Sequence, residues 1–168
     1  MLTKIAPEAL NLNAFQAIGK QWMLVTAGTP ECCNTMTASW GGIGILWAKP
    51  VATAYIRPSR YTKEFVDSSE YFTLSFLPES HRESLVYCGT VSGRDEDKIL
   101  HCGFTTLTAE CGAPYIGEAE VVLICRKLYC QTMREECFID SAEVEQFYPD
   151  REFHDLYIGE IVEAYHNI

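Results

Sequence analysis

Two arginines in a proline-fixed turn are the residues best suited to anion binding in this 168-residue chain. Arg57 and Arg60 belong to the segment RPSRYT, which follows an apolar run that predicts a short buried strand over 51–56. Pro58 fixes a turn, and Thr62 stands where the N-cap of a short helix is expected. Guanidinium groups, hydroxyls and a helix N-terminus in so short a segment can bind phosphate. The alternative is a solvated basic turn.

A second set of polar side chains alternates along an upstream segment. Residues 34–40 read NTMTASW, so Thr35, Thr37 and Ser39 fall on one face of a predicted strand. A row of hydroxyls can donate hydrogen bonds to an anionic or carbonyl-rich ligand. The other interpretation is an amphipathic strand whose hydroxyl face is solvated. Glycines then allow close backbone approach at Gly41, Gly42 and Gly44.

Short strands must position these groups. Apolar runs predict further strands over 72–76, 118–129 and 156–164; the second is expected to be the longest, and the third should close the sheet. Gly159 is expected to form a bulge in the closing strand. Many short strands with few helices favour a single mainly β domain, a β-barrel with appended helices, over a βαβ fold.

Two helices are expected between the strands. The letters SHRE at 80–83 form a capping box, which predicts a helix from Ser80 to about Cys88 that Gly89 ends. The letters SGRD repeat this signal and predict a second helix from Ser92 to about Cys102.

Within that second helix, Arg94 and Lys98 are four residues apart and would share a face. That face would lie either beside a bound anion or in solvent.

Composition restricts the partners. The formal net charge of −10 argues against nucleic acid and against an anionic membrane surface. No apolar run is long enough to span a bilayer, and the first residues lack the apolar core of a signal peptide, so the expected location is cytoplasmic. Basic residues nevertheless gather between Arg57 and Lys98, where an acidic protein can bind a small anion.

The eight cysteines are expected to be reduced thiols. No CxxC pair and no zinc-ligand spacing occurs, so neither a structural metal nor an essential disulfide is predicted. The adjacent pair Cys32 and Cys33 is more readily explained as structural than as redox-active. Motifs of hydrolases, P-loop proteins and Rossmann dinucleotide sites are missing from the sequence.

Six segments in order resemble the flavin reductase-like family, particularly its flavoredoxin-type branch. They are NTMTASWGGIG, KPVATAYIRPSRYTKEF, YFTLSFLP, YCGTVSGRDEDKI, GEAEVVLICRKLY and FHDLYIGEIVEAY. Together they extend over nearly the whole chain. The resemblance implies one flavin reductase-like domain over 1–168, an FMN-binding split β-barrel that is usually a homodimer.

The resemblance also implies a cofactor site. The segment expected beside the isoalloxazine ring comprises Asn34, Thr35, Met36, Thr37, Ala38, Ser39 and Trp40. The groups expected at the phosphate and ribityl chain are Arg57, Ser59, Arg60 and Thr62, with Ser92, Arg94 and Lys98 completing the anion site. His154 matches a histidine that in relatives lies near the flavin or the nicotinamide. A Gly-Asp-His triplet of the reductase branch is Glu152-Phe153-His154 here, which leaves a catalytic role and a capping or core role both open.

Two classes of function remain open at this point. One is an FMN-dependent oxidoreductase that takes electrons from NADH, NADPH or a redox protein, since flavin chemistry needs few protein acids or bases. The other is a module that binds flavin, or another ligand, without turnover. Trp40, Trp47 and the aromatic C-terminal part are expected to provide apolar surface for a dimer contact.

Overall fold

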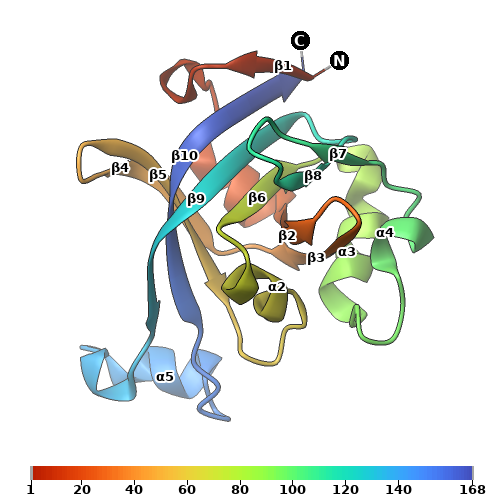
Figure 1. Cartoon of the computed structure of the whole chain (residues 1–168). Helices are drawn as coiled ribbons and strands as arrows, with labels where there is room; N and C mark the ends of the chain where they lie inside the picture. The colour runs from red at the N-terminus through yellow and green to blue at the C-terminus, as the bar shows by residue number, and fades with distance from the viewer. Residues whose placement is uncertain (1, 168) are drawn as a thin grey trace.

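A computed structural model describes residues 2–167 of the chain. Within that range eight strands form one antiparallel sheet in the order β3-β2-β6-β9-β10-β5-β4, with β1 added to β10 (Figure 1). The strands of this sheet are β1 (Leu2–Ile5), β2 (Met23–Thr29), β3 (Cys32–Ala38), β4 (Gly41–Leu46), β5 (Lys49–Ile56), β6 (Tyr71–Phe76), β9 (Val121–Thr132) and β10 (Asp155–Asn167). Two more strands form a small separate ladder, β7 (Thr106–Thr108) and β8 (Pro114–Ile116).

Short helices connect the strands. They are η1 (Pro7–Ala9), α1 (Ala14–Gln16), η2 (Ala17–Gln21), α2 (Thr62–Ser68), η3 (Glu79–His81), α3 (Arg82–Thr90), α4 (Lys98–His101), η4 (Glu135–Cys137) and α5 (Ser141–Phe147). Among the described residues, no helix is both long and apolar enough to cross a membrane. Nor does that part of the chain place three or more His, Cys, Asp or Glu side chains where they could hold a metal ion.

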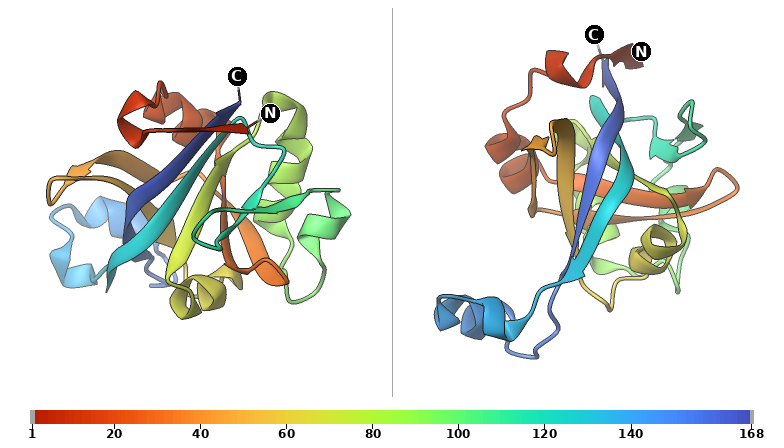
Figure 2. Two further views of the ribbon diagram at one scale, coloured as in Figure 1. Left: turned by 45° about the horizontal axis from the view of Figure 1, so that its top comes forward. Right: turned by 60° about the vertical axis from the view of Figure 1, so that its left-hand side comes forward.

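The sheet coils into a barrel that is split between β3 and β4 (Figure 2). These two strands are the edges of the sheet, although only Ser39 and Trp40 separate them in sequence. The backbone groups on the outer side of β3 therefore have no strand partner in the described sheet, and edge strands are where a ligand or another chain can bond the main chain.

Two hydrophobic cores cover opposite faces of the sheet. One fills the barrel and includes Phe72, Leu74 and Phe76 of β6; the other lies between the sheet, α3 and the β7–β8 ladder. The alternate residues of β6 are buried too, because Thr73 Oγ1 donates to the Pro114 carbonyl at 2.9 Å and Ser75 Oγ accepts from the Ile116 amide at 3.4 Å. Hydroxyls in an alternating strand thus bond the second layer instead of water.

The expected strands over 51–56, 72–76 and 156–164 are confirmed, as is the irregularity at Gly159, where the register of β10 against β9 shifts. The expectation that 118–129 holds the longest strand is wrong, because β10 is one residue longer than β9. β9 and β10 run beyond the barrel together, and α5 lies at their far end (Figures 1 and 2).

The predicted helix boundaries are wrong. No side chain caps α3, which begins after His81 and continues through Gly89 to Thr90. The second helix is confined to α4, with Asp97 as its N-cap, because residues 92–95 form a turn. The first of these helices is held by the core beneath it, which buries Leu85 and Cys88. Local capping signals did not decide either start.

Candidate cofactor site

A cavity of about 220 Å³ opens beside the end of β3 at the split in the barrel. It is lined by Met36, Thr37, Ala38, Ser39, Trp40, Tyr55, Arg57, Arg60 and His154. The set combines the main chain of an edge strand, an indole ring and two guanidinium groups. Most of the residues expected beside a flavin ring thus come together here, along with Tyr55, which the sequence did not single out.

The three hydroxyls predicted to form one row on β3 have different surroundings, so they form neither a continuous ligand-facing row nor a solvated face, although Thr37 and Ser39 line the first cavity. Thr35 is fully buried, accepts from Thr26 Oγ1 at 2.9 Å and donates to the Val25 carbonyl at 3.3 Å. Thr37 Oγ1 donates to the Leu85 carbonyl of α3 at 2.5 Å. Both hydroxyls bond protein groups because the second core covers this side of the strand. Only Ser39 is exposed.

A second cavity of about 130 Å³ lies on the other side of Arg60. It is lined by Ser59, Arg60, Tyr61, Thr62, Thr90, Val91, Ser92, Gly93 and Lys98. Arg60 borders both cavities, so a single elongated ligand can contact the β3 edge and this polar recess. The cavity brings the turn after β5 together with the end of α3 and the start of α4, which are distant in sequence.

Two cations in this recess have no carboxylate partner. Lys98 is only 3% exposed, and its recorded hydrogen bond is to the Cys88 carbonyl at 3.2 Å. Arg60 donates to the carbonyls of Gly89 at 2.7 Å and Cys88 at 3.3 Å. Between residues 2 and 167, no Asp or Glu forms an ion pair with either side chain.

Burial leaves both cations poorly solvated. It is the main reason that the pKa of Lys98 is lowered to about 8, a value to which the neighbouring Arg60 charge contributes less, and burial likewise lowers the pKa of Arg60. A buried charge is costly unless an opposite charge or hydrogen bonds compensate it. The carbonyls of Cys88 and Gly89 bond these two cations without neutralising their charge, so the recess favours binding of an anion.

Thr62 does not cap α2, contrary to expectation. It is the first residue of the helix, is 1% exposed, and its hydroxyl accepts from Asn34 Nδ2 at 2.8 Å. This bond ties β3 to the turn that carries Arg60. Gly93 lies against the same amide, since a Cβ at Gly93 would come within 2.2 Å of Asn34 Oδ1.

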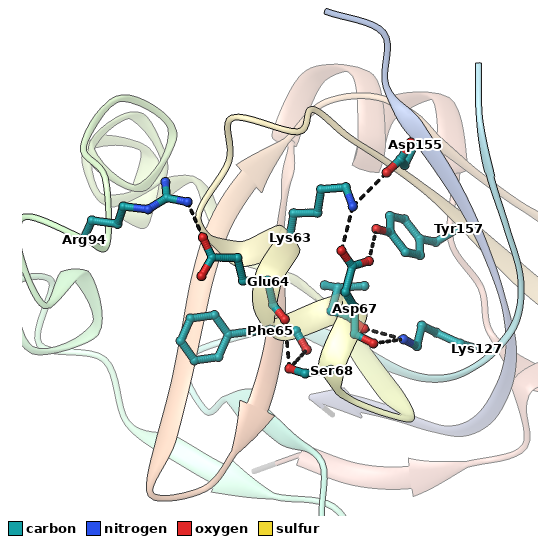
Figure 3. A network of polar contacts seen from close by, with 10 residues as sticks. Lys63, Glu64, Phe65, Asp67, Ser68, Arg94, Lys127, Asp155 and Tyr157 are labelled. Carbon is teal, nitrogen blue, oxygen red and sulfur yellow. Dashed lines mark hydrogen bonds and ion pairs between the residues drawn. The ribbon is translucent and has the colours of Figure 1, made fainter. Parts of the chain in front are cut away.

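A polar network holds α2, and with it the turn before it. Figure 3 shows Lys63 between the carboxylates of Asp67 and Asp155. The Tyr157 hydroxyl donates to the Asp67 carboxylate, and Lys127 Nζ donates to the Asp67 carbonyl at the end of the helix. Lys63 is 2.6 Å from Asp67 and 2.8 Å from Asp155 of β10. Ion pairs of this kind fix α2 against the barrel.

Arg94 and Lys98 do not share a helix face, contrary to expectation. Arg94 is exposed, forms an ion pair with Glu64 (Figure 3) and donates to the Ser59 carbonyl, and it does not line the recess. Ser92 does line the recess. The residues differ in role because 92–95 is a turn, which removes the helical spacing that would align them.

His154 borders the first cavity and is buried among aromatic rings. Its Nδ1 is 2.8 Å from the Tyr148 hydroxyl, and its ring centroid is 4.9 Å from that of Trp40. Burial, followed by the nearby Arg57 charge, lowers the pKa of His154 to about 4. The imidazole is therefore neutral at pH 7 and is held in one orientation.

Arg57 fastens the α5 segment to this wall. Its Nη2 donates to the Phe147 carbonyl at 2.8 Å, while Nη1 lies 3.5 Å from Glu152 and 3.6 Å from Asp150. Unlike Arg60, Arg57 thus has acidic partners. Its guanidinium is better suited to shaping the aromatic wall than to neutralising a phosphate.

A larger apolar cavity of about 550 Å³ adjoins this wall and shares Ser39, Trp40 and Tyr55 with the first cavity. Its aromatic lining comes from Phe15, Trp40, Tyr55, Phe138, Phe147 and Tyr148. Sequence reasoning missed it, because its walls come from segments that are distant in sequence, within 14–19, 39–41, 55 and 133–148. The aromatic-rich letters of 138–153 were the only local signal.

Comparison with known proteins places this fold in one class, the split-barrel domains of the flavin reductase-like type. The family model of the flavin reductase like domain matches residues 15–167. The chain therefore belongs to the flavin reductase-like family. A comparison with curated proteins gives no significant match.

Solved structures share the fold at low sequence identity. An FMN-binding protein from Thermus thermophilus has a TM-score of 0.67 at 23% identity, covering 86% of this chain and 69% of that one. The flavoredoxin of Desulfovibrio vulgaris gives 0.69 at 22% identity, with 98% and 77% covered. An NADH:FAD oxidoreductase from Streptomyces globisporus gives 0.66 at 15% identity, with 88% and 75% covered. At these identities the likeness concerns the fold.

Proposed function

We propose that this protein is an FMN-dependent oxidoreductase of the flavin reductase and flavoredoxin type. The observation that carries the proposal is a pair of cations without a carboxylate partner, the buried Lys98 and the half-buried Arg60, in a recess next to an edge strand and an indole ring. FMN joins a phosphate to a planar aromatic ring. The phosphate matches the two cations, and the ring matches the edge strand and the indole of Trp40. The proteins of similar fold include one named for binding FMN and one named an NADH:FAD oxidoreductase.

Different residues of the site would contact the phosphate and the ring of FMN. Arg60 and Lys98 hold the phosphate, with Ser59, Thr62 and Ser92 along the recess. The edge of β3 from Asn34 to Ser39 offers main-chain groups to the polar rim of the ring, and Trp40 packs beside it. Arg94 has no part in the proposed phosphate site, because it already forms an ion pair with Glu64.

Bound FMN would supply the redox chemistry by accepting and releasing electrons. The protein binds and orients it and excludes water from one side. His154 is neutral, so at pH 7 it acts as a hydrogen-bonding group, fixed by Tyr148, and not as a cation. Its position between Trp40 and Arg57 sets the shape of the wall that a second substrate would meet.

The electron donor is proposed to be NADH or NADPH, with a redox protein as the other option. The test is anaerobic titration of the FMN-loaded protein with each nicotinamide, followed by absorbance of the flavin. Stoichiometric bleaching by NADH or NADPH is expected. Yellow protein that neither nucleotide bleaches, while dithionite does, would support electron transfer from a protein partner or a flavin-binding module without turnover.

We expect the protein to form a homodimer. Ile45 and Trp47 on the β4–β5 hairpin are 73% and 55% exposed, and Trp40 is 40% exposed at the open side of the flavin cavity. Exposed apolar residues gathered on an edge strand are typical of an interface. Sedimentation equilibrium at micromolar concentration should give twice the chain mass. A monomer that retains FMN under these conditions would contradict this expectation.

A further inference from the structure

Two thiols next to the phosphate recess have no part in the proposed chemistry. Cys88 on α3 is fully buried, and Cys102 follows α4 and is partly exposed. Their Sγ atoms are 3.9 Å apart, whereas a disulfide has a bond of about 2.05 Å. The two cysteines are fourteen positions apart in sequence, and no other pair of sulfur atoms within residues 2–167 forms such a contact.

Hydrogen bonds connect both cysteines to the cationic residues of the recess, Cys88 to their charged groups and Cys102 to the backbone of Lys98. The Cys88 carbonyl accepts from Arg60 Nη2 at 3.3 Å and from Lys98 Nζ at 3.2 Å. The Cys102 amide donates to the Lys98 carbonyl at 3.0 Å. Lys98 thus bonds both residues, Cys88 through its ammonium group and Cys102 through its main-chain carbonyl.

We propose that Cys88 and Cys102 form a disulfide under oxidising conditions, and that this disulfide weakens anion binding by Arg60 and Lys98. The sulfur atoms must approach by almost half their present separation, which draws α4 and the end of α3 together. The Cys88 carbonyl that holds both cations then moves. For FMN as the anion, the inference rests on the proposed function.

The oxidant is a low-molecular-weight disulfide such as glutathione disulfide. The more exposed thiolate, that of Cys102, attacks one sulfur of the oxidant, whose S–S bond breaks and releases one thiolate. The Cys88 thiolate then attacks the Cys102 sulfur, forming the protein disulfide and releasing the second thiolate. Two protein thiols are oxidised, one small disulfide is reduced to two thiols, and the two protons pass to the released thiolates.

The second step should depend strongly on pH. Burial and the neighbouring Cys102 raise the pKa of Cys88 to about 12, while Lys98 and Arg60 oppose the rise. The thiolate is the nucleophile, so formation of the protein disulfide should be slow at pH 7. Its rate should rise about tenfold for each unit of increasing pH, as long as the pH stays below the pKa of Cys88.

The experiment starts from fully reduced protein titrated with glutathione disulfide without oxygen. Intact mass and peptide mapping should show loss of two hydrogens and a peptide linked through Cys88 and Cys102. FMN should then bind the oxidised protein at least tenfold more weakly, and riboflavin should bind both forms alike. Because binding and oxidation are linked, saturating FMN, which binds the reduced form more tightly, should raise the midpoint potential of the pair by about 30 mV for a tenfold effect.

Variants make the assignment specific. Cys102→Ser should bind FMN equally before and after the oxidant, whereas Cys32→Ser, which changes an exposed cysteine outside the recess, should respond like wild type. Calorimetry with inorganic phosphate, in both redox forms, measures the recess without the flavin ring.

Either of two results overturns the proposal. One is that no Cys88–Cys102 peptide forms, even at pH 9. The other is that it forms and leaves the affinity for FMN and phosphate unchanged or higher. If the reduced protein binds phosphate but no flavin, the proposed function fails instead, and the phosphate measurement still decides this inference.

Discussion

Lys98→Met is expected to weaken FMN binding about 10- to 100-fold while leaving riboflavin binding nearly unchanged. A hydrogen bond to a charged group contributes about 1.5–3 kcal/mol, and each 1.4 kcal/mol is a factor of ten. Riboflavin lacks the phosphate, so it loses nothing when the cation is removed. Fluorescence quenching of each flavin on titration with protein measures both affinities.

Arg60→Ala should give a loss of the same size, because Arg60 is the other cation of the recess. Arg60 also bonds the carbonyls of Cys88 and Gly89, so its removal could disturb the structure. The affinity of the Arg60→Ala variant for riboflavin serves as the check for such damage. Arg94→Ala is the matched control, since Arg94 is exposed and paired with Glu64. This substitution should change the affinity for FMN less than about twofold.

Equal losses for FMN and riboflavin in the Lys98 and Arg60 variants would show that neither cation reads the phosphate. Unchanged FMN affinity in both would place the anion site elsewhere on the protein.

The same lysine makes a prediction about stability without ligand. Its pKa in the folded protein is about 8, below the ordinary value of 10.5, so between these pH values the unfolded chain binds the proton and the folded chain does not. The free energy of unfolding should therefore rise with pH over this window, by about 3 kcal/mol if Lys98 acts alone. Urea denaturation of wild type and Lys98→Met across the window isolates the effect, since only the variant should lack it.

Saturating FMN should reduce this rise, because the phosphate favours the charged lysine. A variant with the same pH profile as wild type would contradict the depressed pKa of Lys98.

Gly28→Ala is expected to destabilise the protein by about 3 kcal/mol or more. Gly28 has φ of +121°, and a Cβ there would lie 2.3 Å from the Cys32 carbonyl oxygen and 2.8 Å from Cys33 Cα. Both atoms belong to the backbone of β3, so no side chain can move aside. Strained backbone and overpacking each cost about 1–3 kcal/mol. Chemical denaturation gives the free energy of unfolding.

Gly44→Ala provides the matched control on β4. Nothing lies within 4 Å of a Cβ at Gly44, and its φ is not in the left-handed range. Its effect should stay within about 1 kcal/mol. Because Gly28 sets how β2 passes β3, the Gly28 variant should also lose FMN affinity. Equal stability of the two variants would mean that the hairpin backbone is not packed as closely as described.

Local pattern predicted most strands, and for a clear reason. The strands over 51–56, 72–76 and 156–164, and the bulge at Gly159, are visible because alternation and apolar runs follow directly from the strand period. Helix starts were predicted badly. The capping signals at Ser80 and Ser92 were overridden, since contacts with the second core decide where α3 begins and the turn at 92–95 delays α4.

The sequence predicted many of the residues that line the first cavity, but it did not predict which way their side chains point. Met36, Ala38, Arg57 and His154 do meet at one cavity, as the order of segments implied. The hydroxyls of Thr35 and Thr37, however, bond to Val25 and Leu85, because a second layer covers them. Nothing local to β3 shows that a helix packs over it.

The sequence by itself determined the family, the mainly β character and the segment that carries the basic turn. Those properties reside in short-range order: strand alternation, a fixed proline and the sequence of segments along the chain. Only the tertiary structure decided which cations face the anion recess. Arg57 and Arg94 form ion pairs with carboxylates, whereas the half-buried Arg60 and the buried Lys98 bond the carbonyls at the end of α3. Charge compensation depends on distances between segments remote in sequence, and burial, which raises the cost of an unpaired charge, exists only once the chain has folded.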